Sequence, residues 1–108
     1  MIVKKISAEL FNSIEIDVQV DDLVISKVDD EECMIKVSIK NNLSDDITQH
    51  LIDSNRYDIN TTIRDEVLYI NYIKEEMSLL TDPDYFEIIG VIILVPRNIP
   101  YKQIEHEE

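Results

Sequence analysis

The sequence of 108 residues contains one glycine, one cysteine and no tryptophan. The single cysteine, Cys33, excludes a disulfide within the chain and is compatible with a reducing compartment. The single glycine, Gly90, excludes the glycine-rich loops that hold phosphate groups. We therefore expect no nucleotide cofactor, and nothing in the sequence predicts another cofactor.

Basic residues are also scarce, because 10 Lys and Arg stand against 23 Asp and Glu, which gives a formal net charge of -13. Such a charge repels the phosphates of nucleic acids and anionic membrane surfaces. The apolar run at 88–95 is far shorter than the roughly 20 residues that a helix needs to cross a bilayer. We expect no direct nucleic-acid binding and no membrane insertion.

The start of the chain, residues 1–6, has neither the apolar stretch nor the small-residue cleavage site of a secretory signal. No lipidation motif is visible either. The sequence as given predicts a cytoplasmic protein. A location in the cell envelope is the alternative if a signal has been removed from the chain.

The chain does have enough apolar surface for a folded core, since 44% of its residues are hydrophobic. Its length predicts one β domain over residues 1–108. The most apolar stretch, Ile88 to Val95, is rich in β-branched residues and is followed by Pro96. This pattern predicts a strand that is buried on both faces and lies at the centre of the core.

A clean alternation of apolar and polar residues marks a second strand. Ile14, Ile16 and Val18 alternate with Glu15 and Asp17, which is typical of a strand with one buried face. Similar patterns predict further strands at 2–8, 23–28, 33–40, 57–63, 67–74 and 101–104. The acidic residues between the strands at 23–28 and 33–40 predict a hairpin with an acidic tip.

One segment has helical spacing instead. Leu43, Ile47 and Leu51 recur every four residues, and Ser44 is placed to cap the first turn. We predict a short helix over about 45–53, and a loop of undefined shape over 75–84.

The order of these elements resembles the N-terminal portion of a bacterial adhesin-like family of unknown function. The resemblance rests on Phe-x-x-Ile-x-Ile-x-Val at 11–18, the acidic turn after the strand at 23–28, Val-Leu-Tyr-Ile at 67–70, and Val-Ile-Ile-Leu-Val-Pro-x-x-Ile-Pro at 91–100. Members of that family are β-rich and continue into a glycine-punctuated β-solenoid, whereas this chain has one glycine. The expected fold class is all-β: an antiparallel sandwich-like or β-solenoid-start domain of about seven to eight strands with one short helix.

No set of residues predicts catalysis. His50 and His106 are far apart in the sequence and have no cysteine or histidine at zinc-ligand spacing. Cys33 alternates with Ile35 and Val37 on the apolar face of its strand, which favours a buried, inert thiol over a nucleophile. We expect a protein that is not an enzyme and has no metal site.

The acidic turns are the remaining candidates for binding residues. They are Asp21, Asp22, Asp29, Asp30, Glu31, Glu32, Asp82 and Asp84. Their carboxylates are suitable calcium ligands, but none of the turns has the Asp-x-Asp-x-Asp-Gly order of a helix-loop-helix site. Solvated turns are therefore the simpler interpretation.

Two functions of different kinds fit these features. The first is a structural or protein-interaction module that binds a partner, or another copy of itself, through a strand edge. The second is a small acidic inhibitor or decoy whose carboxylates imitate nucleic-acid phosphates in the basic site of another protein. A decoy needs one continuous acidic face, whereas acids occur here on strands, at Glu15 and Asp17, and on turns. That spread favours the module.

Overall fold

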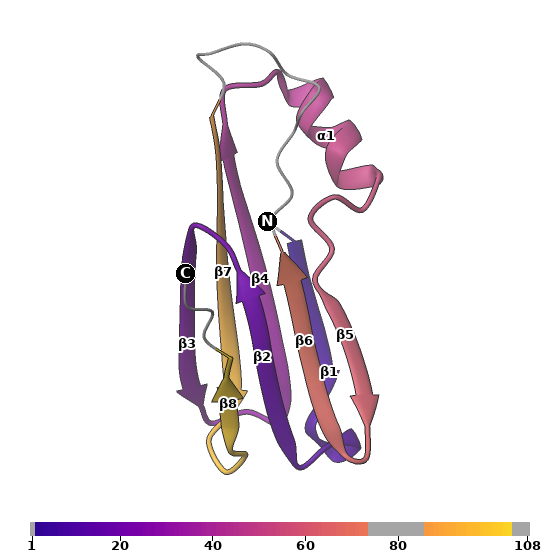
Figure 1. The fold of residues 1–108 in the computed structure, drawn as a ribbon, viewed down its shortest axis with the longest axis vertical. Coiled ribbons are helices and arrows are strands. Elements are labelled where there is room, and N and C mark those ends of the chain that lie inside the picture. Colours follow the sequence, from indigo (N-terminus) through magenta and orange to yellow (C-terminus); the bar gives the residue numbers. More distant parts are fainter. Residues whose placement is uncertain (1, 74–85, 105–108) are drawn as a thin grey trace.

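The computed structural model describes residues 2–73 and 86–104 and consists mostly of β-strands (Figure 1). In chain order the elements are β1 (Ile2–Ser7), the 3-10 turn η1 (Ala8–Leu10), β2 (Ser13–Gln19), β3 (Asp22–Val28), β4 (Glu32–Asn41), α1 (Asp45–Asp53), β5 (Asn60–Arg64), β6 (Val67–Ile73), β7 (Glu87–Pro96) and β8 (Tyr101–Gln103). The predicted loop at 75–84 lies outside the described residues.

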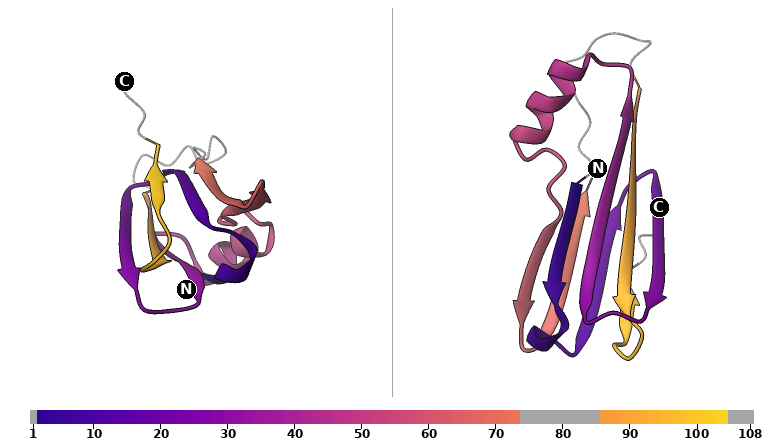
Figure 2. Two further views of the ribbon diagram at one scale, coloured as in Figure 1. Left: turned by 90° about the horizontal axis from the view of Figure 1, so that it is seen from below. Right: turned by 180° about the vertical axis from the view of Figure 1, so that it is seen from behind.

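The strands form two four-stranded sheets that pack face to face (Figure 2). Sheet A has the order β1-β4-β7-β3, and sheet B has the order β5-β6-β2-β8. The prediction of an antiparallel fold is wrong in part, because β3 runs parallel to β7, and β2 runs parallel to both β6 and β8. The β-solenoid alternative is also wrong, since the two sheets are neither closed nor coiled.

The predicted hairpin between the strands at 23–28 and 33–40 does not form. Strand β7 lies between β3 and β4, pairing parallel with the first and antiparallel with the second. The short link at 29–31 therefore passes under β7 at the lower end of the sheet (Figure 1). The most apolar strand takes this interior position, where both of its edges are hydrogen-bonded and one face is covered by sheet B.

Strand β7 is buried on one face only, so the prediction of burial on both faces is wrong. Ile89, Val91 and Ile93 point into the sandwich and are at most 1% exposed. Ile88 and Ile92 point the other way and are 44% and 39% exposed. Successive side chains of the strand point to opposite faces of the sheet, so only every second one reaches the core. Among the described residues, no element covers the outer face of sheet A.

The core lies between the sheets and uses the inward positions that the alternation predicts. Ile14 and Ile16 of β2 are buried against the inward side chains of sheet A, as expected. Cys33 is also confirmed as a buried core residue. Tyr57 and Ile59 belong to the core as well, although they precede β5, which begins at residue 60.

The helix has the predicted bounds. The Ser44 hydroxyl accepts a hydrogen bond from the Ile47 backbone N–H at 3.3 Å, which is the expected N-cap. The helix lies at the upper end of the sandwich, between the ends of β4 and β5 (Figure 1). In the described part of the chain, no helix combines the length and the apolar character needed to cross a membrane.

One-sided burial of β7 predicts different effects for neighbouring substitutions. Ile93→Ala should lower the free energy of unfolding by about 2–5 kcal/mol, because it leaves a cavity between the sheets. Ile92→Ala is the matched control and should lower it by less than about 1 kcal/mol. Urea titrations of both variants measure the difference. Equal losses would contradict a strand with one exposed face.

Candidate functional site

The predicted acidic turns do not form one site. Asp21 and Asp22 lie at the upper end of β3, and Asp29, Asp30 and Glu31 follow its lower end (Figure 1). The seven residues of β3 separate the two groups by roughly 20 Å, at about 3.3 Å per residue. Asp82 and Asp84 lie outside the described residues.

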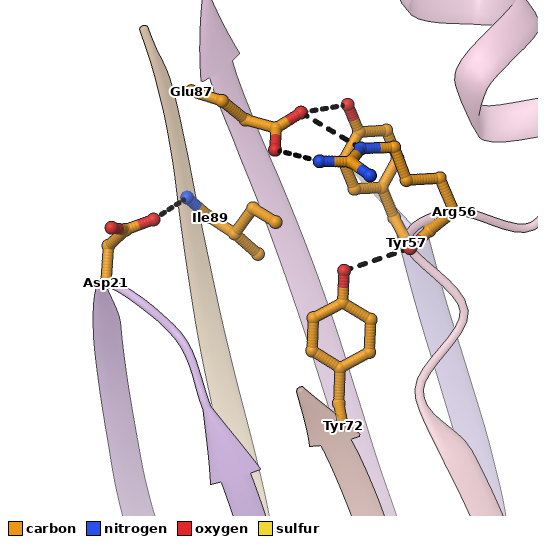
Figure 3. Close-up of polar contacts among 6 residues, drawn as sticks. All are labelled: Asp21, Arg56, Tyr57, Tyr72, Glu87 and Ile89. Carbon is orange, nitrogen blue, oxygen red and sulfur yellow. Dashed lines mark hydrogen bonds and ion pairs between the residues drawn. The ribbon is translucent and has the colours of Figure 1, made fainter. Parts of the chain in front are cut away.

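Several of these carboxylates stabilise the turns themselves. Asp21 accepts a hydrogen bond from the Ile89 backbone N–H at 2.8 Å, which ties the β2–β3 turn to β7 (Figure 3). Asp30 accepts from the Glu31 N–H at 2.7 Å. The Asp29 carboxylate lies 2.7 Å from the Arg97 guanidinium. These contacts explain the acids locally, without a ligand.

A hollow of about 600 Å³ lies at the lower end of the sandwich. Its acidic lining residues are Glu9, Asp29, Asp30, Glu31 and Glu32. Among the residues that the structure describes, no three His, Cys, Asp or Glu side chains are grouped closely enough to hold a metal ion. The hollow is therefore lined mainly by acidic side chains, together with Arg97, which pairs with Asp29.

The sequence analysis missed a buried ion pair at the upper end of β7. The Glu87 carboxylate accepts hydrogen bonds from the Arg56 guanidinium at 2.7 Å and from the Tyr57 hydroxyl at 2.6 Å (Figure 3). The Glu87 side chain is 2% exposed. One signal was present in the sequence: Glu87 has the same strand parity as the inward-pointing Ile89.

This network joins the segment after the helix to sheet A. Tyr72 of β6 donates a hydrogen bond to the Arg56 backbone carbonyl at 2.9 Å, so the same residue is held from both sheets. The hydrogen bond to Glu87 is the main cause that raises the pKa of Arg56. Burial, followed by the hydrogen bond to Glu87, raises the pKa of Tyr57. The network has the geometry of a structural clamp.

Cys33, the residue considered as a nucleophile, is a buried thiol. Burial raises the pKa of the Cys33 thiol to about 11, so the thiol keeps its proton at neutral pH. His50 is exposed on α1, and His106 lies outside the described residues.

The outer face of sheet A is the most unusual surface of the molecule. The register aligns one outward row across its four strands: Val3, Lys36, Ile92 and Val24. Val3 is 49% exposed and Val24 is 44% exposed. In the adjacent row, Met34 and Leu94 pair with each other and are half-buried. The apolar side chains of β7 and β3 are thus neighbours on this face, and Ile88 adds a further exposed apolar side chain near the start of β7.

The charged side chains on this face are mostly basic. Lys5, Lys36 and Lys40 occupy outward positions on β1 and β4. None of the three forms an ion pair with another described residue, whereas Lys4, Arg56 and Arg97 each pair with an acid. Acids occur at outward positions only near the strand ends, at Asp22 and Glu32.

The outer face of sheet B has a different character. Glu15, Asp17 and Asn71 line a hollow of about 380 Å³ there. Arg64 lies over the Tyr69 ring, with its guanidinium carbon 4.7 Å from the ring centre, and therefore covers the aromatic surface that a ligand would stack on. This mixed polar face is typical of a solvated sheet.

The chain matches no protein-family model, no curated protein and no solved structure. The resemblance to the adhesin-like family therefore stays a prediction from sequence.

The buried ion pair predicts strong coupling between its partners. Arg56→Met should lower the free energy of unfolding by about 3–5 kcal/mol, because it leaves the Glu87 carboxylate buried without a cation. The double variant Arg56→Met/Glu87→Gln should recover part of that loss. Chemical unfolding of the single and double variants measures the coupling, and simple additivity of the two changes would contradict it.

Burial of the Cys33 thiol predicts that it reacts slowly with thiol reagents in the folded state. At pH 8 native Cys33 should react with a disulfide reagent at least about a hundredfold more slowly than in denaturant, because its pKa of about 11 leaves little thiolate. The Ser26→Cys variant adds a thiol on the exposed outer face of sheet A and should show one fast and one slow thiol. Fast reaction of both thiols in the native variant would refute a protected Cys33.

Proposed function

We propose that this protein is a non-catalytic protein-interaction module that binds its partner through the outer face of sheet A. One observation carries the proposal: exposed apolar side chains of β1, β7 and β3 share one face with Lys36 of β4, in a chain in which 31% of residues are charged. Single exposed apolar residues are ordinary, but a contiguous apolar surface is typical of an interaction site.

The free energy of hydration favours covering this face. Removing apolar surface from water contributes roughly 25 cal/mol per Å², so four or five half-exposed aliphatic side chains provide a substantial driving force. The outward positions of β7 are the clearest case, because Ile88 and Ile92 replace the polar residues that a solvated strand normally has there. The face is part of a hydrogen-bonded sheet and needs little reorganisation on binding.

The sequence predicts binding through a strand edge, whereas this proposal places the binding site on the outer face of sheet A. Strands β1 and β3 are the edges of sheet A and border the apolar face. A partner that lies on the face buries side chains from all four strands, whereas a strand added at one edge reaches only the neighbouring ones. We therefore favour the face. The adhesin-like resemblance supports the same class of function.

A second candidate, the acidic inhibitor or decoy, is favoured by the lower end of the sandwich. Five acidic residues from η1, the β3–β4 link and the start of β4 line one hollow there. A basic protein site is the expected partner of such a surface, through long-range attraction that salt weakens.

Capture of partners from a lysate of the source cells tests the proposal. The tagged chain is compared with Val24→Ser/Ile92→Ser, which removes apolar side chains from the outer face of sheet A, and with Ile73→Ser, which removes an exposed one from sheet B. We expect proteins that bind both the natural chain and the sheet B control. The same proteins should be captured at least about tenfold less by the sheet A variant.

The other outcomes contradict the proposal. Equal capture by all three chains, or no specific capture, would remove the outer face of sheet A as a binding site. Proteins with basic nucleic-acid sites, held equally by all three chains and released at high salt, would support the decoy instead.

A further inference from the structure

The charges on the outer face of sheet A identify the chemistry of its partner. We infer that this face binds an acidic protein segment with interspersed apolar side chains. The inference rests on the proposed function, and it adds which kind of segment the face recognises.

The distribution of charge carries the inference. The whole chain has 10 Lys and Arg against 23 Asp and Glu, so an average surface region is acidic. The outer face of sheet A reverses this balance, because Lys5, Lys36 and Lys40 lie among its apolar side chains and acids occur only near the strand ends. Three lysines without a described acidic partner leave this face complementary to carboxylates.

The register gives the binding surface a pattern. Lys36 and Lys40 lie on the same side of β4, four residues and roughly 13 Å apart. Their partners on β7 are Ile92 and Ile88, so a basic stripe on β4 runs beside an apolar stripe on β7. The row between these two pairs contains Ser38 and Gly90 and ends at Asp22, the first residue of β3. A matching segment has carboxylates along one side and apolar side chains along the other.

Two other occupants fit this pattern less well. A second copy placed face to face offers no acids opposite the lysines, apart from Asp22 and Glu32 near the strand ends, and brings together two bodies that each carry -13. A nucleic acid offers phosphates, but the net charge repels it and nothing in its backbone covers Ile88 and Ile92.

An unbiased peptide selection tests the inference. A phage-displayed library of random 12-residue peptides is selected on the full natural chain, after depletion on Val24→Ser/Ile92→Ser. Enriched peptides that contain several Asp or Glu together with Leu, Ile, Val or Phe are the expected result. Their binding should weaken steeply between 50 and 300 mM salt, since the ion pairs are solvent-exposed.

Matched charge variants then locate the contact. Lys36→Gln/Lys40→Gln should raise the Kd of a selected, fluorescently labelled peptide by about tenfold, measured by fluorescence anisotropy, because it removes two exposed ion pairs. Arg64→Gln/Lys102→Gln makes the same change in net charge on sheet B and should weaken it less than about twofold. Circular dichroism and urea titration of each variant verify that the fold is retained.

The outcomes separate the inference from the proposed function. Enriched peptides that need Val24 and Ile92 but are neutral or basic would overturn the inference and leave the interaction face in place. Selection of no peptide would overturn the inference as well. So would equal loss of binding in Lys36→Gln/Lys40→Gln and Arg64→Gln/Lys102→Gln. A salt-stable dimer of the natural chain that is lost in Val24→Ser/Ile92→Ser, measured by sedimentation, would assign the face to a second copy and overturn it too. The proposed function itself is tested by the lysate capture, whose variants leave the lysines unchanged.

Discussion

Strand β7 hydrogen-bonds to β3 on one side and to β4 on the other, while one of its faces packs against sheet B. Those two ladders and that packed face hold sheet A together, because β3 and β4 do not pair with each other. Removal of the inward side chains of β7, such as Ile93, would expose the neighbouring strands as well as the strand itself. The sandwich therefore depends on burying half of a strand that is apolar on both faces.

The outward side chains Ile88 and Ile92 of β7 are exposed in the described structure, and their partners on β4 are Lys40 and Lys36. A protein of net charge -13 has enough acids to make every outward face soluble, and the outer face of sheet B does contain Glu15 and Asp17. On sheet A the outward positions of β4 include Lys36 and Lys40 in its second half, with Glu32 at its start. Exposed apolar side chains beside lysines that have no ion-pair partner among the described residues are the combination expected of a surface that binds an acidic partner.

The buried Arg56–Glu87 pair contributes to specificity of the fold. It joins the segment after α1 to the start of β7, and Tyr72 ties the same segment to sheet B (Figure 3). A buried ion pair adds little net stability compared with apolar packing, but separating its partners is costly. The pair therefore fixes the segment after α1 against the start of β7, at the upper end of the sandwich.

Local patterns in the sequence determined the strands and the helix, because alternation, the Ser44 cap and four-residue spacing act between near neighbours. They did not determine which strands pair, so the hairpin at 23–40 was wrong: pairing depends on contacts between residues far apart in the chain. The acidic turns were visible in the sequence, yet only the tertiary structure separates Asp22 from Asp29 and gathers Lys5, Lys36 and Ile92 on one face. An apolar run also looks the same whether its second face meets a core or a partner, and only the packing of the sheets decided that Ile88 and Ile92 remain exposed.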